Sequence, residues 1–308
     1  MKKIIALLMV LVLAVAVFVA CDNGTQDPVE KDYTLSIGVV VKENLAGKKV
    51  DETVATVVTD SDGKIVLCRV DCIKYEAKYD EAGALNTKAP TSNVALGDNY
   101  GQMPAGTWAN QGAALEKYLV GKTQAEVAGV VSNGYAADAE LKASCSIAIS
   151  DLVKAIDNAF KSAYKVTFKS TATEFTAGLS AVAAVKDSST DDSKNAKFTT
   201  DFAAAVLADG KVVAAIIDTA EAELKGISDE GAASLSFAGT KREQGDNYDS
   251  YSPMPAGRWY QQVDAFAKTA VGKSASDIAG LASEGVAGCT IYAGGYKAAV
   301  EAAVKAAR

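Results

Sequence analysis

The chain has 308 residues and no histidine, and its 38 acidic residues outnumber its 31 basic residues, giving a net charge of −7. Without histidine, the chain cannot form a Ser-His-Asp or Cys-His catalytic arrangement, a histidine-liganded zinc site or a haem with an axial histidine. An acidic chain with no basic stripe is also unsuited to binding nucleic acid.

The N-terminal segment has the pattern of an export signal. Two lysines precede an apolar run over residues 4–20, which ends at Cys21. The segment FVAC, residues 18–21, resembles a bacterial lipobox with phenylalanine where leucine is commoner. We predict a lipoprotein signal peptide over 1–20, lipidation of Cys21 and a flexible polar tether over 21–32; an uncleaved membrane anchor is the alternative. The protein would then face the extracytoplasmic side of the cell envelope, held to the membrane by its lipid.

The remainder of the chain is a long duplication. The paired segments are GDNY at 97–100 and 245–248, MPAG-x-W at 103–108 and 254–259, VGK at 120–122 and 271–273, and DGK at 62–64 and 209–211. A period this long indicates a duplicated domain and not a solenoid, whose repeats are far shorter. We predict two homologous domains, 33–163 and 164–308, and expect each to fold alone.

Each unit begins with β-rich runs and continues with helices. In the first unit, the runs 51–60 and 64–79 flank an Asp-Gly turn, which predicts a β-hairpin. A helix follows near each tryptophan, and then a short helix that begins with a capping box, Thr123 to Glu126 or Ser274 to Asp277. A closing helix ends each unit. One apolar face of the last helix is formed by Tyr296, Ala299, Val300, Ala303, Val304 and Ala307.

This order of elements predicts the fold class α+β. Each of the two tandem domains would contain an antiparallel β-hairpin or sheet packed on helices, because strands come first and helices later. The polar stretch over 187–197 is expected to be a solvated loop.

The cysteines offer no metal or redox motif. No Cys-x-x-Cys occurs, and Cys68 and Cys72 would lie about 13 Å apart along one strand, which is too far for a disulfide. We interpret both as small buried hydrophobic residues. We predict no metal site, no phosphate-binding P-loop and no catalytic residues.

A small-residue corner precedes the closing helix in both units. The two segments are ELKASCSI, residues 140–147, and EGVAGCTI, residues 284–291. A hydroxyl residue in such a loop lies where backbone N–H groups and a helix dipole favour a phosphate. The second segment resembles the flavinylation motif of the FMN-binding domain family, Asp-x-x-Ser-Gly-Ala-Thr followed by an apolar residue.

That resemblance implies covalent FMN on a threonine hydroxyl, attached by a dedicated flavin transferase. In the second unit Thr290 matches the acceptor and Gly288 the glycine, while Glu284, Ala287 and Cys289 replace the acid, the serine and the alanine. In the first unit the acceptor would be Ser146. Its four other motif positions hold Glu140, Ala143, Ser144 and Cys145. Because Ser144 replaces the glycine, we expect any flavin to be carried mainly by Thr290.

The resemblance extends to the order of elements in both units. It implies a lipid-anchored electron-transfer protein with redox partners, and not a catalyst with its own substrate. The alternative is a non-redox binding or structural lipoprotein in which the corner only turns the chain. Four aromatic residues near the MPAG segments could stack on a flavin ring or pack in the core: Tyr100, Trp108, Tyr248 and Trp259.

Overall fold

The computed structural model describes residues 29–172, 174–250 and 254–308. The predicted signal peptide, Cys21 and most of the predicted tether lie outside these residues. The first strand begins at Lys31, so the last two residues assigned to the tether, Lys31 and Asp32, belong to a strand. Within the described ranges, no helix has both the length and the apolar character needed to cross a bilayer.

The first sheet has four antiparallel strands in the order β3-β2-β1-β6. The strands are β1 (Lys31–Asn44), β2 (Lys49–Asp60), β3 (Ile65–Glu76) and β6 (Val166–Ser170). The hairpin predicted around the Asp-Gly turn is formed by β2 and β3. Strand β1 was not predicted from the sequence, although its apolar residues pair with β2 along its whole length.

The second sheet also has four antiparallel strands, in the order β10-β9-β8-β7, but its fourth strand lies at the opposite edge from that of the first sheet. Its strands are β7 (Thr176–Asp187), β8 (Ala196–Ala208), β9 (Lys211–Lys225) and β10 (Ser234–Ser236). Strands β8 and β9 form the second Asp-Gly hairpin, and β7 takes the place that β1 has in the first sheet. The polar stretch predicted as a loop is the β7–β8 connection, with its ends inside the two strands.

The helices follow the hairpin strands within each unit, as predicted, whereas β6 comes after the last helix of the first unit. Those of the first unit are α1 (Asn93–Leu96), α2 (Trp108–Leu119), α3 (Gln124–Ala128), α4 (Ala139–Ser144) and α5 (Ser150–Lys161), with a short hairpin of β4 (Val131–Ser132) and β5 (Tyr135–Ala136). Those of the second unit are α6 (Lys241–Gln244), α7 (Trp259–Lys268), α8 (Ala275–Ile278) and α9 (Gly294–Lys305). Short 3₁₀ turns follow α1 at Gly97–Tyr100 and α6 at Gly245–Asn247.

Both capping boxes are present. The Thr123 backbone N–H donates to Glu126 Oε2 at 2.7 Å, and the Ser274 backbone N–H donates to Asp277 Oδ2 at 3.1 Å. These contacts satisfy N–H groups that the start of a short helix leaves without partners. The fold is therefore α+β with antiparallel sheets, as the sequence predicts.

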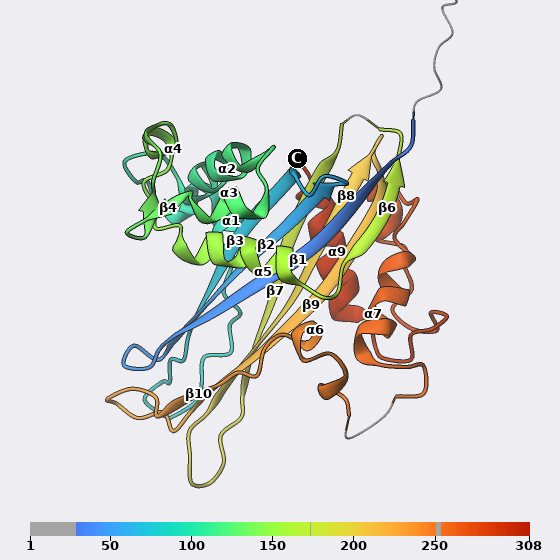
Figure 1. Cartoon of the computed structure of the whole chain (residues 1–308). Helices are drawn as coiled ribbons and strands as arrows, with labels where there is room; N and C mark the ends of the chain where they lie inside the picture. The colour runs from blue at the N-terminus through green and yellow to red at the C-terminus, as the bar shows by residue number, and fades with distance from the viewer. Residues whose placement is uncertain (1–28, 173, 251–253) are drawn as a thin grey trace, which may run out of the picture.

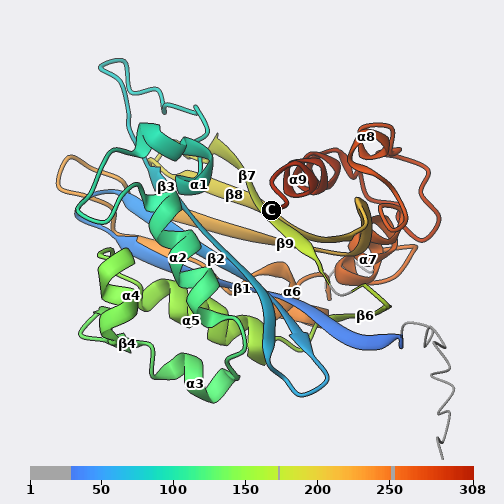
Figure 2. The ribbon, with the colours of Figure 1, turned by 90° about the horizontal axis from the view of Figure 1, so that it is seen from above.

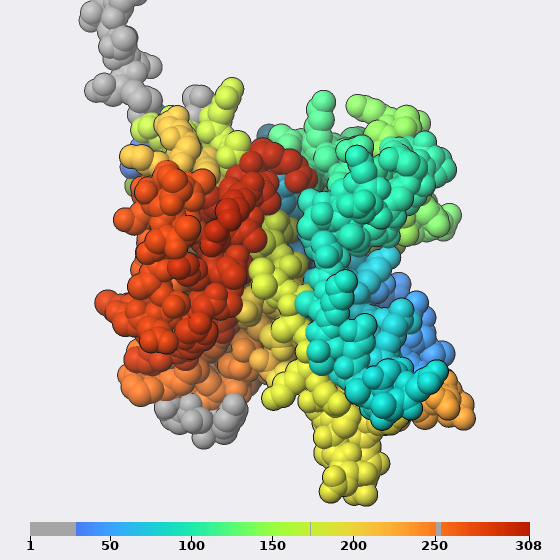
Figure 3. Space-filling view, turned by 180° about the vertical axis from the view of Figure 1, so that it is seen from behind, coloured from blue at the N-terminus to red at the C-terminus, as the bar shows by residue number. Residues whose placement is uncertain are grey.

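The molecule has four layers, because the two sheets pack face to face and helices cover their outer faces (Figures 1 and 2). Helices α2 and α5 cover the first sheet, and α7 and α9 cover the second. From behind, the two groups of helices lie on opposite sides of the molecule with β7 between them (Figure 3). The inner core contains apolar side chains of both units, including Val54 and Val58 of β2 and Phe202 and Ile216 of the second sheet.

This packing changes the predicted domain organisation. Strand β6 follows the boundary placed between residues 163 and 164, yet it pairs with β1 of the first sheet. The boundary therefore has to move beyond Ser170. Each sheet also buries its inner face only against the other sheet. An isolated half would expose that apolar face to water, so the structure does not support the expectation that each unit folds alone.

Two glycines allow the closing helices to approach the sheets closely. A Cβ at Gly38 of β1 would lie 2.8 Å from the Asn158 carbonyl carbon, and a Cβ at Gly178 of β7 would lie 2.8 Å from the Ala307 nitrogen. Because the obstructing atoms are backbone, they cannot rotate away as side chains do. Glycine therefore fixes how closely α5 and α9 pack on their sheets.

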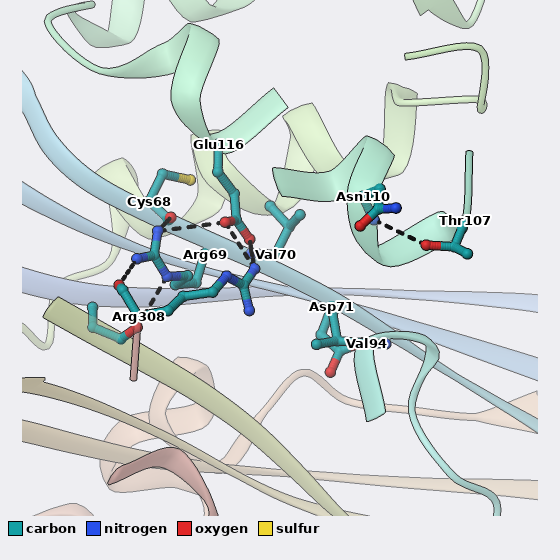
Figure 4. A network of polar contacts seen from close by, with 10 residues as sticks. Cys68, Arg69, Val70, Asp71, Val94, Thr107, Asn110, Glu116 and Arg308 are labelled. Atoms are coloured by element: carbon teal, nitrogen blue, oxygen red, sulfur yellow. Dashed lines mark hydrogen bonds and ion pairs between the residues drawn. The ribbon is translucent and has the colours of Figure 1, made fainter. Parts of the chain in front are cut away.

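One side of the sandwich is closed by an ionic cluster that joins the two units (Figure 4). Glu116 of α2 is buried, and its carboxylate accepts hydrogen bonds from Arg308 Nη2 at 2.9 Å and from the Val70 backbone N–H at 3.0 Å. Arg69 of β3 lies 3.4 Å from the same carboxylate and donates from Nε to the Ala177 carbonyl at 2.9 Å. A single buried carboxylate thus links β3 and α2 to β7 and Arg308 of the second unit.

On the opposite side of the sandwich, where β1 lies beside β9, the buried Arg242 pairs with Asp264 of its own unit. This side contains a cavity of about 260 Å³ lined by β1, the end of α5 and α6. Asp218 and Arg242 are almost fully buried there, and the Asp218 Oδ1 accepts a hydrogen bond from the Arg242 backbone N–H at 3.1 Å. Burial raises the pKa of Asp218 to about 6.

A carboxyl group is buried between the two sheets. Glu52 of β2 is fully buried and accepts a hydrogen bond from Thr200 Oγ1 of β8, and Tyr75 Oη lies 2.5 Å from the same hydroxyl. Within the described residues, Glu52 Oε1 has no hydrogen-bond partner. Burial raises the pKa of Glu52 to about 8, so at neutral pH the group is mainly protonated.

We therefore predict that Glu52→Gln stabilises the protein more at pH 8 than at pH 5. An acid whose folded-state pKa is raised binds a proton that the unfolded chain releases above about 4.5, so stability falls between pH 4.5 and about 8. This loss of unfolding free energy is about 5 kcal/mol at most. Glutamine removes the pH dependence because its side chain does not ionise. Urea unfolding at pH 5, 6.5 and 8 measures the effect. The exposed residue Glu43 provides the control, and an equal change for Glu43→Gln and Glu52→Gln would contradict the prediction.

Candidate functional site

The corner before α9 is held by one buried glutamine. Gln262 lies on α7, one turn after Trp259, and is fully buried. Its Oε1 accepts hydrogen bonds from the Thr290 backbone N–H at 2.8 Å, from Thr290 Oγ1 at 3.0 Å and from the Ile291 N–H at 3.3 Å. Its Nε2 donates to the Gly257 carbonyl at 2.9 Å, so the glutamine joins the corner to the MPAG segment.

The first unit has the same set of hydrogen bonds around a buried glutamine, which we call the glutamine clamp. Gln111 of α2 accepts from the Ser146 backbone N–H at 2.6 Å, from Ser146 Oγ at 3.0 Å and from the Ile147 N–H at 3.1 Å. Its Nε2 donates to the Gly106 carbonyl at 2.8 Å. The clamp explains why a hydroxyl residue follows cysteine in both units, since the hydroxyl adds a third donor to one carbonyl oxygen.

Neither glutamine was singled out in the sequence. The available signal was the repeat itself, because a glutamine stands three residues after the tryptophan in both units. That signal gives only a helical position, and it does not show that the side chain points toward a loop some 30 residues later in the chain. The contact depends on how the corner folds back onto α7.

The structure separates the residues of the predicted motif by exposure. Thr290 and Ser146 are exposed, although both hydroxyls are hydrogen-bonded to the clamp. Cys289 is buried, its Sγ lies 3.5 Å from the Ile291 carbonyl, and burial raises the pKa of the thiol. Cys289 therefore packs in the interior. The remaining motif residues, Glu284, Ala287, Gly288, Glu140, Ala143 and Ser144, are exposed, and Cys145 is buried.

The two corners are reached by different backbone paths. Gly288 has φ 78°, a conformation that side chains disfavour, and it turns the chain directly before Cys289. A Cβ at this position would also lie 3.1 Å from the Ala265 Cβ. In the first unit, Ser144 is instead the last residue of α4 and its Oγ donates to the Leu141 carbonyl at 3.3 Å. Glycine is thus required only in the second unit.

Four backbone N–H groups in and beside the second corner already have partners within the protein and are not available to a phosphate. The N–H groups of Thr290 and Ile291 face Gln262, that of Cys289 donates to the Val286 carbonyl at 2.9 Å, and that of Ala293 donates to the Ser283 carbonyl at 3.0 Å. Four donors are therefore already satisfied within the protein. A phosphate at this corner would have to be held by a covalent bond or by other groups.

The start of α9 faces an acidic side chain. A Cβ at Gly295 would lie 2.5 Å from Asp201 Oδ2, so the β8 carboxyl group lies against the first turn of the helix. Thr219 Oγ1 donates to Asp201 Oδ1 at 2.7 Å, and burial raises the pKa of Asp201. This arrangement already places an acid near the positive end of the helix dipole. The prediction that this end points at a flavin phosphate is therefore not supported.

The four aromatic residues near the MPAG segments pack mainly on the protein. Trp108 and Trp259 are buried, and each packs with the tyrosine of its own GDNY segment, with ring centroids 6.5 Å and 6.0 Å apart. Trp259 Nε1 also donates to Tyr296 Oη at 2.9 Å. The Lys241 ammonium lies 4.8 Å from the Tyr248 ring centroid and 2.9 Å from Glu221 Oε1. These contacts favour the core-packing alternative for the tryptophans.

Two residues of the first corner border a surface cavity. Glu140 and Ser144 line a space of about 590 Å³ between α2 and α4, together with Lys117, Tyr118 and Lys122. Ser146, the predicted acceptor, is absent from this lining. The two features are therefore not one site.

The described residues provide no metal or disulfide site. They include no group of three or more Cys, Asp or Glu side chains that could hold a metal ion. Their four cysteines, Cys68, Cys72, Cys145 and Cys289, are free and buried. This agrees with the interpretation of Cys68 and Cys72 as packing residues.

Comparisons with family models, with curated proteins and with solved structures gave no match. The functional argument therefore depends on the geometry of the site and on the resemblance of the corner to the flavinylation motif.

We predict that Gln262→Leu destabilises the protein by about 2–3 kcal/mol, because it leaves two partly buried N–H groups without an acceptor. Urea unfolding at constant pH measures this loss. Gln261→Leu is the matched control: Gln261 is exposed and accepts only one capping bond, from the Arg258 N–H at 2.8 Å. Its loss should stay below about 1 kcal/mol. Equal losses for the two variants would show that the clamp adds nothing to stability.

Proposed function

We propose that this protein is a membrane-anchored, extracytoplasmic lipoprotein that carries FMN on Thr290 and transfers electrons. The observation that carries the proposal is the position of the Thr290 hydroxyl. Thr290 is an exposed residue, it lies in the segment that resembles the flavinylation motif, and the direction of its hydroxyl is fixed by a hydrogen bond to a buried side chain. An enzyme that modifies a hydroxyl needs access to it and a defined backbone around it, and this corner offers both.

The residues of the corner fit a covalently attached flavin better than a flavin held by its phosphate alone. Thr290 provides the oxygen of the phosphoester. Gln262 orients the free hydroxyl before attachment, and its bonds from the Thr290 and Ile291 N–H groups do not depend on that hydroxyl. Gly288 provides the turn, and Glu284 is exposed where a flavin transferase could contact it. When bound, FMN would supply the redox chemistry, while the protein supplies attachment and orientation.

The second unit is the better carrier because its corner keeps the glycine turn. Ser146 is also exposed and is clamped in the same way, so access alone does not distinguish the two hydroxyls. The two hydroxyls differ in the backbone segment that precedes them, which is irregular before Thr290 and helical before Ser146. A transferase that recognises a non-helical motif would find it only before Thr290.

The second candidate function is a non-redox binding or structural lipoprotein. The clamp favours it, because Gln111 and Gln262 complete the hydrogen bonds of the corners with no flavin attached, whereas a phosphoester on the hydroxyl would remove one of the three bonds to the glutamine oxygen. Without a flavin, the hydroxyl would serve only to complete the hydrogen bonds of a turn. The two functions differ in a visible property, since a flavoprotein is yellow and the alternative is colourless.

Co-expression with a flavin transferase, followed by intact mass measurement, tests the flavin proposal. We expect the wild type to gain the mass of one FMN and the Thr290→Ala variant to gain none, because alanine lacks the oxygen that forms the phosphoester. The Ser146→Ala variant is the matched control and should keep the adduct. A wild-type protein that stays colourless and unmodified would favour the second function.

Replacement of Cys21 tests the predicted anchor. We expect Cys21→Ser to release the protein from membrane fractions or to leave an unprocessed precursor, because serine cannot carry the thioether-linked lipid. Cell fractionation and mass measurement of the N-terminus detect both outcomes. Cys289→Ser, at a buried packing position, is the control and should leave membrane retention unchanged. Normal processing and full membrane retention of Cys21→Ser would contradict the anchor.

A further inference from the structure

An exposed tyrosine lies two residues after Thr290. Tyr292 leaves 69% of its surface in contact with solvent, which is unusual for a large aromatic side chain in a folded protein. Its neighbours in the chain are anchored, because Ile291 is bonded to Gln262 and Ala293 is fully buried. The backbone that carries the ring is therefore fixed, although the ring itself is exposed.

A glycine at the start of α9 makes room for this ring. A Cβ at Gly294 would lie 2.5 Å from Tyr292 Cε1 and Cζ, so the edge of the ring occupies the space that a side chain at 294 would need. The ring thus rests beside the first residue of the helix. Its position depends on the absence of a side chain at Gly294.

The first unit has no counterpart to this arrangement. The glutamine clamps align Thr290 with Ser146, and this register aligns Tyr292 with Ala148 and Gly294 with Ser150. The aromatic ring and the glycine beside it therefore occur only in the unit that we propose as the flavin carrier. Neither is needed to form the clamp, because the first unit forms it without them.

We infer that the Tyr292 ring is the surface on which the isoalloxazine ring of a flavin attached to Thr290 stacks. This inference rests on the proposed function. The two side chains start at most about 7 Å apart along the backbone, so a tethered flavin stays within reach of the ring. Tethering gives the second contact a high effective concentration, so a modest stacking interaction holds the flavin against the protein. Stacking also covers an aromatic surface that is otherwise exposed to water.

Flavin fluorescence tests the inference, because a tyrosine in contact with an excited flavin donates an electron to it and recovers that electron without emission. A typical aromatic pair favours contact about fivefold, so we expect Tyr292→Leu to raise the emission per attached flavin about fivefold. The attached flavin is counted by intact mass. Free FMN in the same buffer gives the unstacked reference.

Two further variants complete the test. Gly294→Ala keeps the tyrosine but displaces its ring, so it should also raise the emission. Tyr135→Leu removes a tyrosine of the first unit that is 53% exposed, and it should leave the emission unchanged. Full flavin attachment with unchanged emission in Tyr292→Leu would overturn the stacking role and leave the proposed function intact. A wild type with no attached flavin would overturn both.

Discussion

The face-to-face packing of the two sheets is the contact on which the rest of this structure depends. Each sheet has helices on its outer face and would otherwise expose its inner face to water. Burial of that face removes a large apolar area from solvent, which is the dominant favourable contribution to folding. The two units therefore share one core between their sheets, and β6 belongs with the first sheet, in which it pairs with β1.

This packing also explains where the polar groups of the interior lie. Glu52 and Thr200 occupy equivalent places in the two units and contact each other across the sheet interface. One side of the sandwich is closed by Glu116 with Arg69 and Arg308, whereas the other side has a cavity beside Asp218 and Arg242. The duplication has therefore diverged at its two sides, since an ionic cluster joins the two units on one side, whereas the Arg242 ion pair on the other side stays within the second unit.

The corner illustrates how one short motif can serve two purposes. Gln262 and Gln111 stabilise the turn by collecting three hydrogen bonds on a single buried oxygen. The same contact leaves the hydroxyls of Thr290 and Ser146 at the surface in a fixed orientation. Because a fixed, accessible hydroxyl also suits covalent modification, the stabilising role and the proposed carrier role are compatible. The surroundings differ between the units, since Gly288, Tyr292 and Gly294 occur only in the second.

The sequence alone determined the local elements, because their signals lie within a few residues of one another. The Asp-Gly hairpins, the helices that begin at Trp108 and Trp259, and the two capping boxes depend on spacing of 2.0 or 3.6 residues and on adjacent caps. Only the tertiary structure decided the features that join distant segments. The sheet interface, the pairing of β6 with β1 and the reach of Gln262 to Thr290 depend on how these elements pack. The exposure of Tyr292 could not be predicted from the sequence either. The spacing of apolar residues does not show which aromatic ring the completed fold leaves uncovered.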